Sequence, residues 1–199
     1  MTSDRVWFVG LTGGMGAGKS TALAELERLE AAVLSTDAVV HELYEGERLR
    51  DAVVERWGEG VAPGGVVDRA KVAERVFADD REREWLEGML WPLVGGRMAE
   101  WLKQVRSWEP PPRAAVVEVP LLFEAGMQDA FDATIAVVAE EQVRRERAAS
   151  RGHALGDARA ARQLSQEEKA RRATFTVRND GSEHELAAQL SAVLDTLSG

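Results

Sequence analysis

The chain has 199 residues, no cysteine, and 34 acidic against 25 basic side chains, which gives a formal net charge of −9 at pH 7. Without cysteine there is no disulfide framework, no thiolate nucleophile and no cysteine-based metal site, and the acidic balance argues against general binding to nucleic acid or to a membrane surface. The chain contains no run of about 18 apolar residues that would predict a membrane span, and we do not expect the N-terminus to be a signal peptide. We therefore expect a cytoplasmic protein with one good core and room for a small inserted region.

The first predicted element is a buried strand that leads through a glycine-rich loop into a helix. Residues 6–11 are continuously apolar, and residues 21–30 carry leucines at helical spacing. Between them, the loop matches the phosphate-binding pattern G-x-x-x-x-G-K-[ST], which is filled by Gly13, Gly18, Lys19 and Ser20. Strand, glycine loop and helix in this order predict a site for nucleotide phosphates.

The residue types in this loop suit phosphate chemistry. Glycines let the chain turn tightly and bring backbone N–H groups against phosphate oxygens, and the dipole of the following helix favours the same anion. We expect the Lys19 ammonium to reach the β and γ phosphates and the Ser20 hydroxyl to ligate the Mg²⁺ that bridges them. The alternative is a glycine-rich turn that binds nothing, which the flanking strand and helix disfavour.

The second predicted strand is short, begins at residue 31 and ends at Asp37. The carboxyl ends of the strands form the ligand crevice of an open α/β sheet, so Asp37 is a candidate base facing the γ-phosphate. Asp37 also fits an N-cap for the helix predicted over 38–44, because aspartate is a favoured cap. The two roles do not exclude each other.

Residues 45–112 contain no predicted strand and are interpreted as a helical insertion. Helices are predicted over 49–57, over 69–77 with Asp68 as the cap, and from 80 onward, with Pro92 restarting the last helix. Such an insertion commonly builds the wall of an acceptor site. Plain structural packing is the alternative, and it is the commoner role of a helix.

Three further strands are predicted over 114–119, 134–139 and 173–178. Glu118 lies near the end of the first of these, where an acid can contact Mg²⁺ indirectly in the manner of a Walker-B residue. Since a buried carboxylate needs a partner, a structural hydrogen-bond acceptor is the alternative. Five strands separated by helices predict an α/β fold, with a five-stranded parallel sheet and helices on both faces.

Residues 140–172 differ from the rest of the chain because they carry eight arginines and one lysine against six acids. Arg144, Arg147 and Arg151 fall on one face of a predicted helix. Guanidinium groups pair with phosphate through two parallel hydrogen bonds, so the pattern indicates a helical lid that clamps polyphosphate. A solvated helix pair joined by salt bridges is the alternative.

These elements predict a single P-loop kinase domain over residues 1–199. Its core comprises about 1–44, 113–139 and 173–199, with the acceptor-side insertion at 45–112 and the arginine-rich lid at 140–172. A small-molecule kinase competes with a switch GTPase or other signalling NTPase and with a module that binds nucleotide structurally. No guanine-reading N-K-x-D motif is present, and the insertion, the aspartate and the arginines together favour a kinase that acts by positioning and charge.

The sequence resembles the dephospho-coenzyme A kinase family along nearly its whole length. The most specific shared features are Pro-Leu-Leu-Phe-Glu at 120–124 and Asn-Asp-Gly at 179–181. Further shared segments are 10–20, 35–37, 41–44, 68–69, 76–77, Arg147 with Arg151, Arg159 with Gln163, and 167–169. The resemblance implies ATP-dependent phosphorylation of the ribose 3′-hydroxyl of dephospho-coenzyme A, the last step of coenzyme A synthesis. Another P-loop small-molecule or nucleotide kinase, or a regulatory NTPase, is the alternative.

The resemblance also implies roles for individual residues. Asp37 matches the family's proposed catalytic base, and Lys19 and Arg147 complete the catalytic set. The implied ATP site consists of Gly13, Gly14, Gly16, Ala17, Gly18, Lys19, Ser20, Thr21, Arg147, Arg151 and Asn179. The implied acceptor site consists of Asp37, His41, Arg69, Pro120, Leu121, Leu122 and Glu124. Mg²⁺ is expected at Ser20, with Glu118 acting indirectly.

The expected partners are therefore small molecules, ATP and dephospho-coenzyme A, with no nucleic acid or membrane partner; the oligomeric state is left open. The sequence departs from the family pattern at two places that bear on function. Glu118 stands where the family usually has aspartate, and Trp91 with Pro92 stands where a His-Pro pair is usual. Any role of that histidine does not transfer to this chain.

Overall fold

The structure is a computed structural model that describes residues 5–150 and 163–198. It contains one five-stranded sheet, all of whose strands are parallel, in the order β2-β3-β1-β4-β5. The predicted α/β class and parallel sheet are confirmed. The chain divides into two compact units: one holds residues up to Ser35 and from Trp101 onward, and the other holds Thr36–Glu100. The helical unit thus begins nine residues before the predicted insertion, because it takes in the helix that follows β2.

The sheet belongs to the first unit. Its strands are β1 (Trp7–Gly13), β2 (Ala32–Ser35), β3 (Ala114–Glu118), β4 (Ala133–Val138) and β5 (Phe175–Arg178). Strand β1 is central and pairs with both β3 and β4. β3 is buried at every position, as are nearly all positions of β1 and β4, which explains why these strands read as continuous apolar runs.

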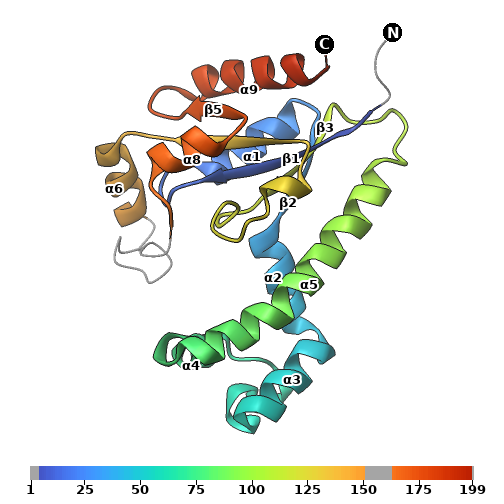
Figure 1. Ribbon diagram of the computed structural model, residues 1–199, viewed down its shortest axis with the longest axis vertical. Helices are drawn as coiled ribbons and strands as arrows, with labels where there is room; N and C mark the ends of the chain where they lie inside the picture. Colours follow the sequence, from blue (N-terminus) through green and yellow to red (C-terminus); the bar gives the residue numbers. More distant parts are fainter. Residues whose placement is uncertain (1–4, 151–162, 199) are drawn as a thin grey trace. The chain divides into compact units, whose positions relative to one another are not determined.

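Helices cover both faces of this sheet. The helices α1 (Lys19–Arg28) and α9 (Glu183–Ser198) pack side by side on one face, where Leu26 and Leu190 join the buried core with Val9 and Leu11 of β1 (Figure 1). The opposite face carries α8 (Gln166–Arg172) and the segment from 120 to 131, which includes the 3₁₀ turn η3 (Gln128–Ala130). The helix α6 (Glu141–Ser150) follows β4.

The second unit is helical and has its own core. It contains α2 (Thr36–Glu45), α3 (Glu47–Trp57), the 3₁₀ turns η1 (Glu59–Val61) and η2 (Pro63–Gly65), α4 (Arg69–Ala78) and most of α5 (Asp80–Val105). Buried side chains from α3, α4 and α5 meet in this core, among them Val53, Val72 and Leu86. Asp68 caps α4 as predicted, because its carboxylate accepts from Ala70 N and Lys71 N.

The predicted restart of a helix at Pro92 is wrong. The helix α5 runs through Pro92 without a break over 26 residues. A proline inside a helix removes one backbone hydrogen bond and crowds the carbonyl four residues earlier, which here belongs to Gly88. Val94 and Met98 are buried beyond the proline, and their burial favours continuation of the helix. None of the helices in the described ranges, α5 included, is long and apolar enough to cross a membrane.

The predicted N-cap role of Asp37 is also wrong. Helix α2 begins at Thr36, so Asp37 lies inside its first turn, and its side chain is exposed. The carboxylate still favours this end of the helix, because the first turn carries partial positive charge. Since Asp37 is not held as a cap, it remains available for chemistry.

Glu82 offers a test of the helical unit's stability. Its carboxylate accepts from Arg56 Nε and Arg56 Nη2, both at 2.9 Å, and from Trp57 Nε1 at 2.6 Å. These hydrogen bonds, with that of Arg56 the largest cause, lower the pKa of Glu82 below its usual range. A lowered carboxylate pKa stabilises the fold at neutral pH, and this contribution is lost as pH falls through the folded-state pKa.

We therefore expect Glu82→Gln to lower the thermal midpoint by a few degrees at pH 7, with a difference from wild type that shrinks in acid. Thermal unfolding followed by circular dichroism between pH 7 and about pH 3 measures this. Glu84→Gln, an exposed position on the same helix, is the control. A difference of the same size at every pH would contradict the assignment.

Candidate active site

The glycine loop has the strand–loop–helix geometry that the sequence predicts. It joins β1 to α1, and Gly16 and Gly18 have φ of +75° and +91°, a backbone region that favours glycine. A side chain at Gly18 would also clash with the amide of Asn179. Gly18 therefore cannot be replaced without moving the loop. Among the described residues, no side-chain hydrogen bond caps the start of α1, where backbone N–H groups favour an anion.

The Lys19 side chain folds back over the loop. Its ammonium donates to the backbone oxygen of Gly14 at 3.2 Å, and the side chain is half-buried. Ser20, in the first turn of α1, is exposed. A fixed cation and the N–H groups of a helix start lie together here, and this combination suits a polyphosphate.

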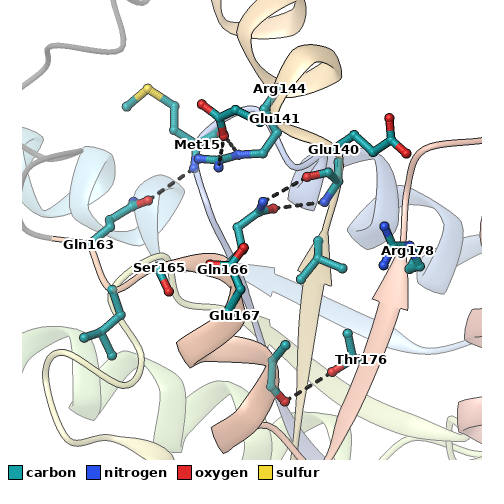
Figure 2. Close-up of a pocket in the computed structure, with 14 residues that line it drawn as sticks. Met15, Glu140, Glu141, Arg144, Gln163, Ser165, Gln166, Glu167, Thr176 and Arg178 are labelled. Carbon is teal, nitrogen blue, oxygen red and sulfur yellow. Dashed lines mark hydrogen bonds and ion pairs between the residues drawn. The ribbon is translucent and has the colours of Figure 1, made fainter.

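Helix α6 lies directly against the loop. Arg144 Nε donates to Met15 O at 2.9 Å, and a Cβ added at Gly16 would lie 2.5 Å from the backbone oxygen of Arg144. Met15 is also contacted through its backbone N–H, which donates to Gln163 Oε1 at 3.2 Å (Figure 2). Met15 of the phosphate loop is therefore bound by both described parts of the arginine-rich segment, residues 140–150 and 163–172.

Arg147 and Asn179 support the loop from the β5 side. Arg147 donates to Asn179 O at 2.9 Å, and Asn179 Nδ2 donates to Ala17 O at 2.9 Å. The Asn179 side chain is buried. Its side-chain amide thus fixes the loop at Ala17, and its backbone carbonyl holds Arg147. Arg151, Arg159 and Arg162, which the sequence also indicated, lie outside the described residues.

Arg147 provides a test of the arginine-rich segment. We expect Arg147→Met to lower kcat/KM for ATP by about 10- to 100-fold, because a charge-assisted hydrogen bond to phosphate would be lost, while the thermal midpoint changes little. Initial rates across an ATP series measure this. The control is Arg145→Met on the same helix, where Arg145 is exposed and pairs with Glu141. A large loss of stability with normal activity would favour the salt-bridged alternative.

A cavity of about 540 Å³ opens beside Met15, between the ends of β4 and β5 and the helices α6 and α8 (Figure 2). Gln166 on its wall is fully engaged, because its side-chain amide exchanges two hydrogen bonds, both 2.9 Å, with the backbone of Ala139. Arg178 at the rim pairs with Asp180. Hydrogen bonds to the backbone therefore fix one wall of the cavity, and its lining carries both acidic and arginine side chains. The cavity adjoins Met15, the loop residue that Arg144 and Gln163 contact.

The segment after β3 departs from its predicted role in two places. Leu122 is fully buried against Gly10, so it packs in the core. Glu124 is engaged by Lys169, whose ammonium lies 2.9 Å from Glu124 Oε1, and by the backbone N–H of Leu164 at 2.8 Å. Pro120 and Leu121 are half-buried. Beyond its place in a shared segment, Lys169 could not be singled out from the sequence, because its partners lie more than 40 residues away.

The remaining predicted acceptor residues lie in the helical unit. Asp37 and His41 are four residues apart on α2, so they share a face of that helix. Arg69 Nη1 lies 2.6 Å from His41 Nδ1, and its guanidinium lies over the ring of Tyr44. The structure thus brings His41 and Arg69 together and leaves Asp37 exposed one turn away.

The residues predicted for Mg²⁺ are oxygen donors. Ser20 offers an exposed hydroxyl, and Glu118 is a buried carboxylate at the last position of β3, in register with Leu11 of β1. Among the described residues, no group of three or more acidic, histidine or cysteine side chains could hold a metal. Hydroxyl and carboxylate oxygens suit Mg²⁺, which is commonly bound by one or two protein groups together with substrate phosphates.

Comparison with known proteins assigns a family to this arrangement. A sequence model described as dephospho-CoA kinase matches residues 7–185. The dephospho-CoA kinase of Deinococcus radiodurans is 38% identical over 196 residues, which cover 95% of this chain and 91% of that protein. The crystal structure of TT1252 from Thermus thermophilus has a TM-score of 0.82 at 32% identity, covering 98% and 100% of the two chains. The dephospho-CoA kinase from Campylobacter jejuni, 20% identical, shares the fold with a TM-score of 0.63 and covers 96% and 97%.

Proposed function

The chain belongs to the dephospho-coenzyme A kinase family, and on that premise we propose which of its residues carry out the family's reaction. The enzyme phosphorylates the ribose 3′-hydroxyl of dephospho-coenzyme A with ATP, which gives coenzyme A and ADP and completes coenzyme A synthesis. A bond forms between the 3′-oxygen and the γ-phosphorus while the bond from that phosphorus to the β–γ bridging oxygen breaks, so the protein must align the two substrates and neutralise charge.

The loop from Gly13 to Thr21 binds the ATP phosphates in this proposal. Backbone N–H groups and Lys19 neutralise the β and γ oxygens, and Arg147, with Arg151, adds charge from the arginine-rich segment. Asn179 contributes by fixing Ala17 and Arg147 in place. The observation that carries the proposal is the convergence of Lys19, Arg147 and Asn179 on one glycine loop at the start of α1.

Asp37 is the proposed base, which accepts the proton of the 3′-hydroxyl as the new bond forms. It follows β2 by two residues and is exposed in the first turn of α2. His41 and Arg69, joined by their hydrogen bond, are the proposed acceptor-binding residues of the helical unit. Pro120 and Leu121 are those proposed in the unit that holds the sheet.

Mg²⁺ is the proposed cofactor. When bound with ATP, the ion would neutralise charge on the β and γ phosphates. Ser20 would hold it through the hydroxyl oxygen, and Glu118 would accept hydrogen bonds from its water ligands. We also propose that the enzyme acts in the cytoplasm.

The test of the function is ADP release from ATP and Mg²⁺ with four acceptor conditions: dephospho-coenzyme A, AMP, adenosine and no acceptor. We expect turnover that requires dephospho-coenzyme A. Turnover with AMP or adenosine instead would keep the kinase mechanism and reassign the acceptor. Slow hydrolysis that ignores every acceptor would contradict the kinase assignment.

A further inference from the structure

Lys169 on α8 is a fully buried cation outside the proposed catalytic set. Its side chain has no exposed surface. The ammonium donates to Pro120 O at 2.7 Å and to Thr12 Oγ1 at 3.4 Å, and it lies 2.9 Å from Glu124 Oε1. Each of the three N–H groups of the ammonium thus has an acceptor oxygen within the protein.

Stability alone is a weak reason for this arrangement. Burial lowers the pKa of Lys169, and pairing with Glu124 offsets that effect only in part. Glu124 Oε2 is buried and has no hydrogen-bond partner among the described residues. A partly satisfied buried network is less favourable than an apolar cluster of the same volume, so replacing a buried ion pair by apolar side chains is often neutral or stabilising.

The partners of Lys169 lie in or contact three segments whose relative positions matter for the proposed reaction. These are the start of the phosphate loop, the acceptor-side segment 120–124 and the returning end of the arginine-rich segment. Thr12 is the residue before the phosphate loop, and its hydroxyl also donates to Pro120 O at 3.3 Å. Pro120 opens the segment proposed to meet the acceptor. Glu124 accepts both from Lys169 and from the backbone N–H of Leu164, which lies at the returning end of the arginine-rich segment.

We propose that Lys169 is a positioning residue for phosphoryl transfer, whose ammonium fixes the start of the phosphate loop relative to the acceptor-side segment 120–124 and the returning end of the arginine-rich segment. The inference rests on the proposed function, because the relative positions of these segments matter only if the phosphate loop and segment 120–124 bind the two substrates. A displacement of about 1 Å between reacting groups can reduce the rate about 100-fold, even when the altered residue is remote from the chemistry.

Two variants and one control separate positioning from folding. Lys169→Met removes the ammonium but leaves the Glu124 carboxylate buried and unpaired. Lys169→Met combined with Glu124→Gln removes both charges, while the glutamine oxygen can still accept from Leu164 N. Lys103→Met is the control, because Lys103 is exposed on α5.

For each protein we would measure the thermal midpoint and, at a temperature well below it, kcat with both substrates saturating. We expect Lys169→Met to lower the midpoint and the double variant to regain much of it, whereas kcat stays about 100-fold low in both. Recovery of kcat together with the midpoint would overturn the proposal and leave Lys169 a folding residue only. A normal kcat in any folded variant that lacks the ammonium would overturn it as well.

Wild type and Lys103→Met show whether the proposed function itself holds. If neither phosphorylates dephospho-coenzyme A, the acceptor assignment is what fails. If both are active and the Lys169 variants are equally active, the positioning role is what fails.

Discussion

Lys19→Ala is expected to lower kcat by at least about 10²- to 10³-fold, the cost of removing one preorganised group that stabilises developing charge. The Lys19 ammonium is held over the loop by its hydrogen bond to Gly14 O, so its charge is in place before the transition state forms. ADP release with saturating ATP and dephospho-coenzyme A measures the effect. Turnover within a few-fold of wild type would contradict the assignment of the phosphate loop.

The control for this variant separates catalysis from folding. Lys103→Ala removes an ammonium of the same kind from an exposed position on α5 and is expected to keep full activity. Lys19→Ala itself should unfold close to the wild-type midpoint, because the side chain is only half-buried and its hydrogen bond to Gly14 O is long, at 3.2 Å. A collapse of the midpoint would assign the loss of activity to the loop's structure.

Asp37→Asn is expected to lower turnover by about 10²- to 10⁴-fold, the usual contribution of a positioned general base. Asparagine keeps the shape of the side chain but cannot take a proton. Because Asp37 is exposed and does not cap α2, the substitution removes no cap interaction. ATP affinity, measured by titration calorimetry, should remain near the wild-type value.

The matched control is Glu42→Gln, which neutralises another exposed carboxylate on the same helix. It should leave turnover unchanged if the effect at Asp37 is specific. A parallel loss of ATP affinity in Asp37→Asn would indicate a metal or structural role for this carboxylate instead of proton transfer.

The fold class and the location of the nucleotide loop could be predicted from the amino-acid sequence alone. Both depend on local signals: apolar runs predict buried strands, helical spacing predicts helices, and the G-x-x-x-x-G-K-[ST] pattern needs only eight consecutive residues. The cap at Asp68 was predictable for the same reason. Local signals failed at Pro92, because burial of Val94 and Met98 outweighed the lost hydrogen bond.

Which distant residues support the loop could not be predicted and becomes visible only in the folded chain. Asn179 reaches Ala17 across 162 positions, and Lys169 reaches Thr12 across 157. Glu124 is an example: its segment is shared with the family and was predicted to bind the acceptor. In the structure its carboxylate instead pairs with Lys169 and accepts a hydrogen bond from Leu164 N. Such contacts arise where parallel strands end at one edge of a sheet, and neither spacing nor periodicity along the chain encodes which side chains meet there.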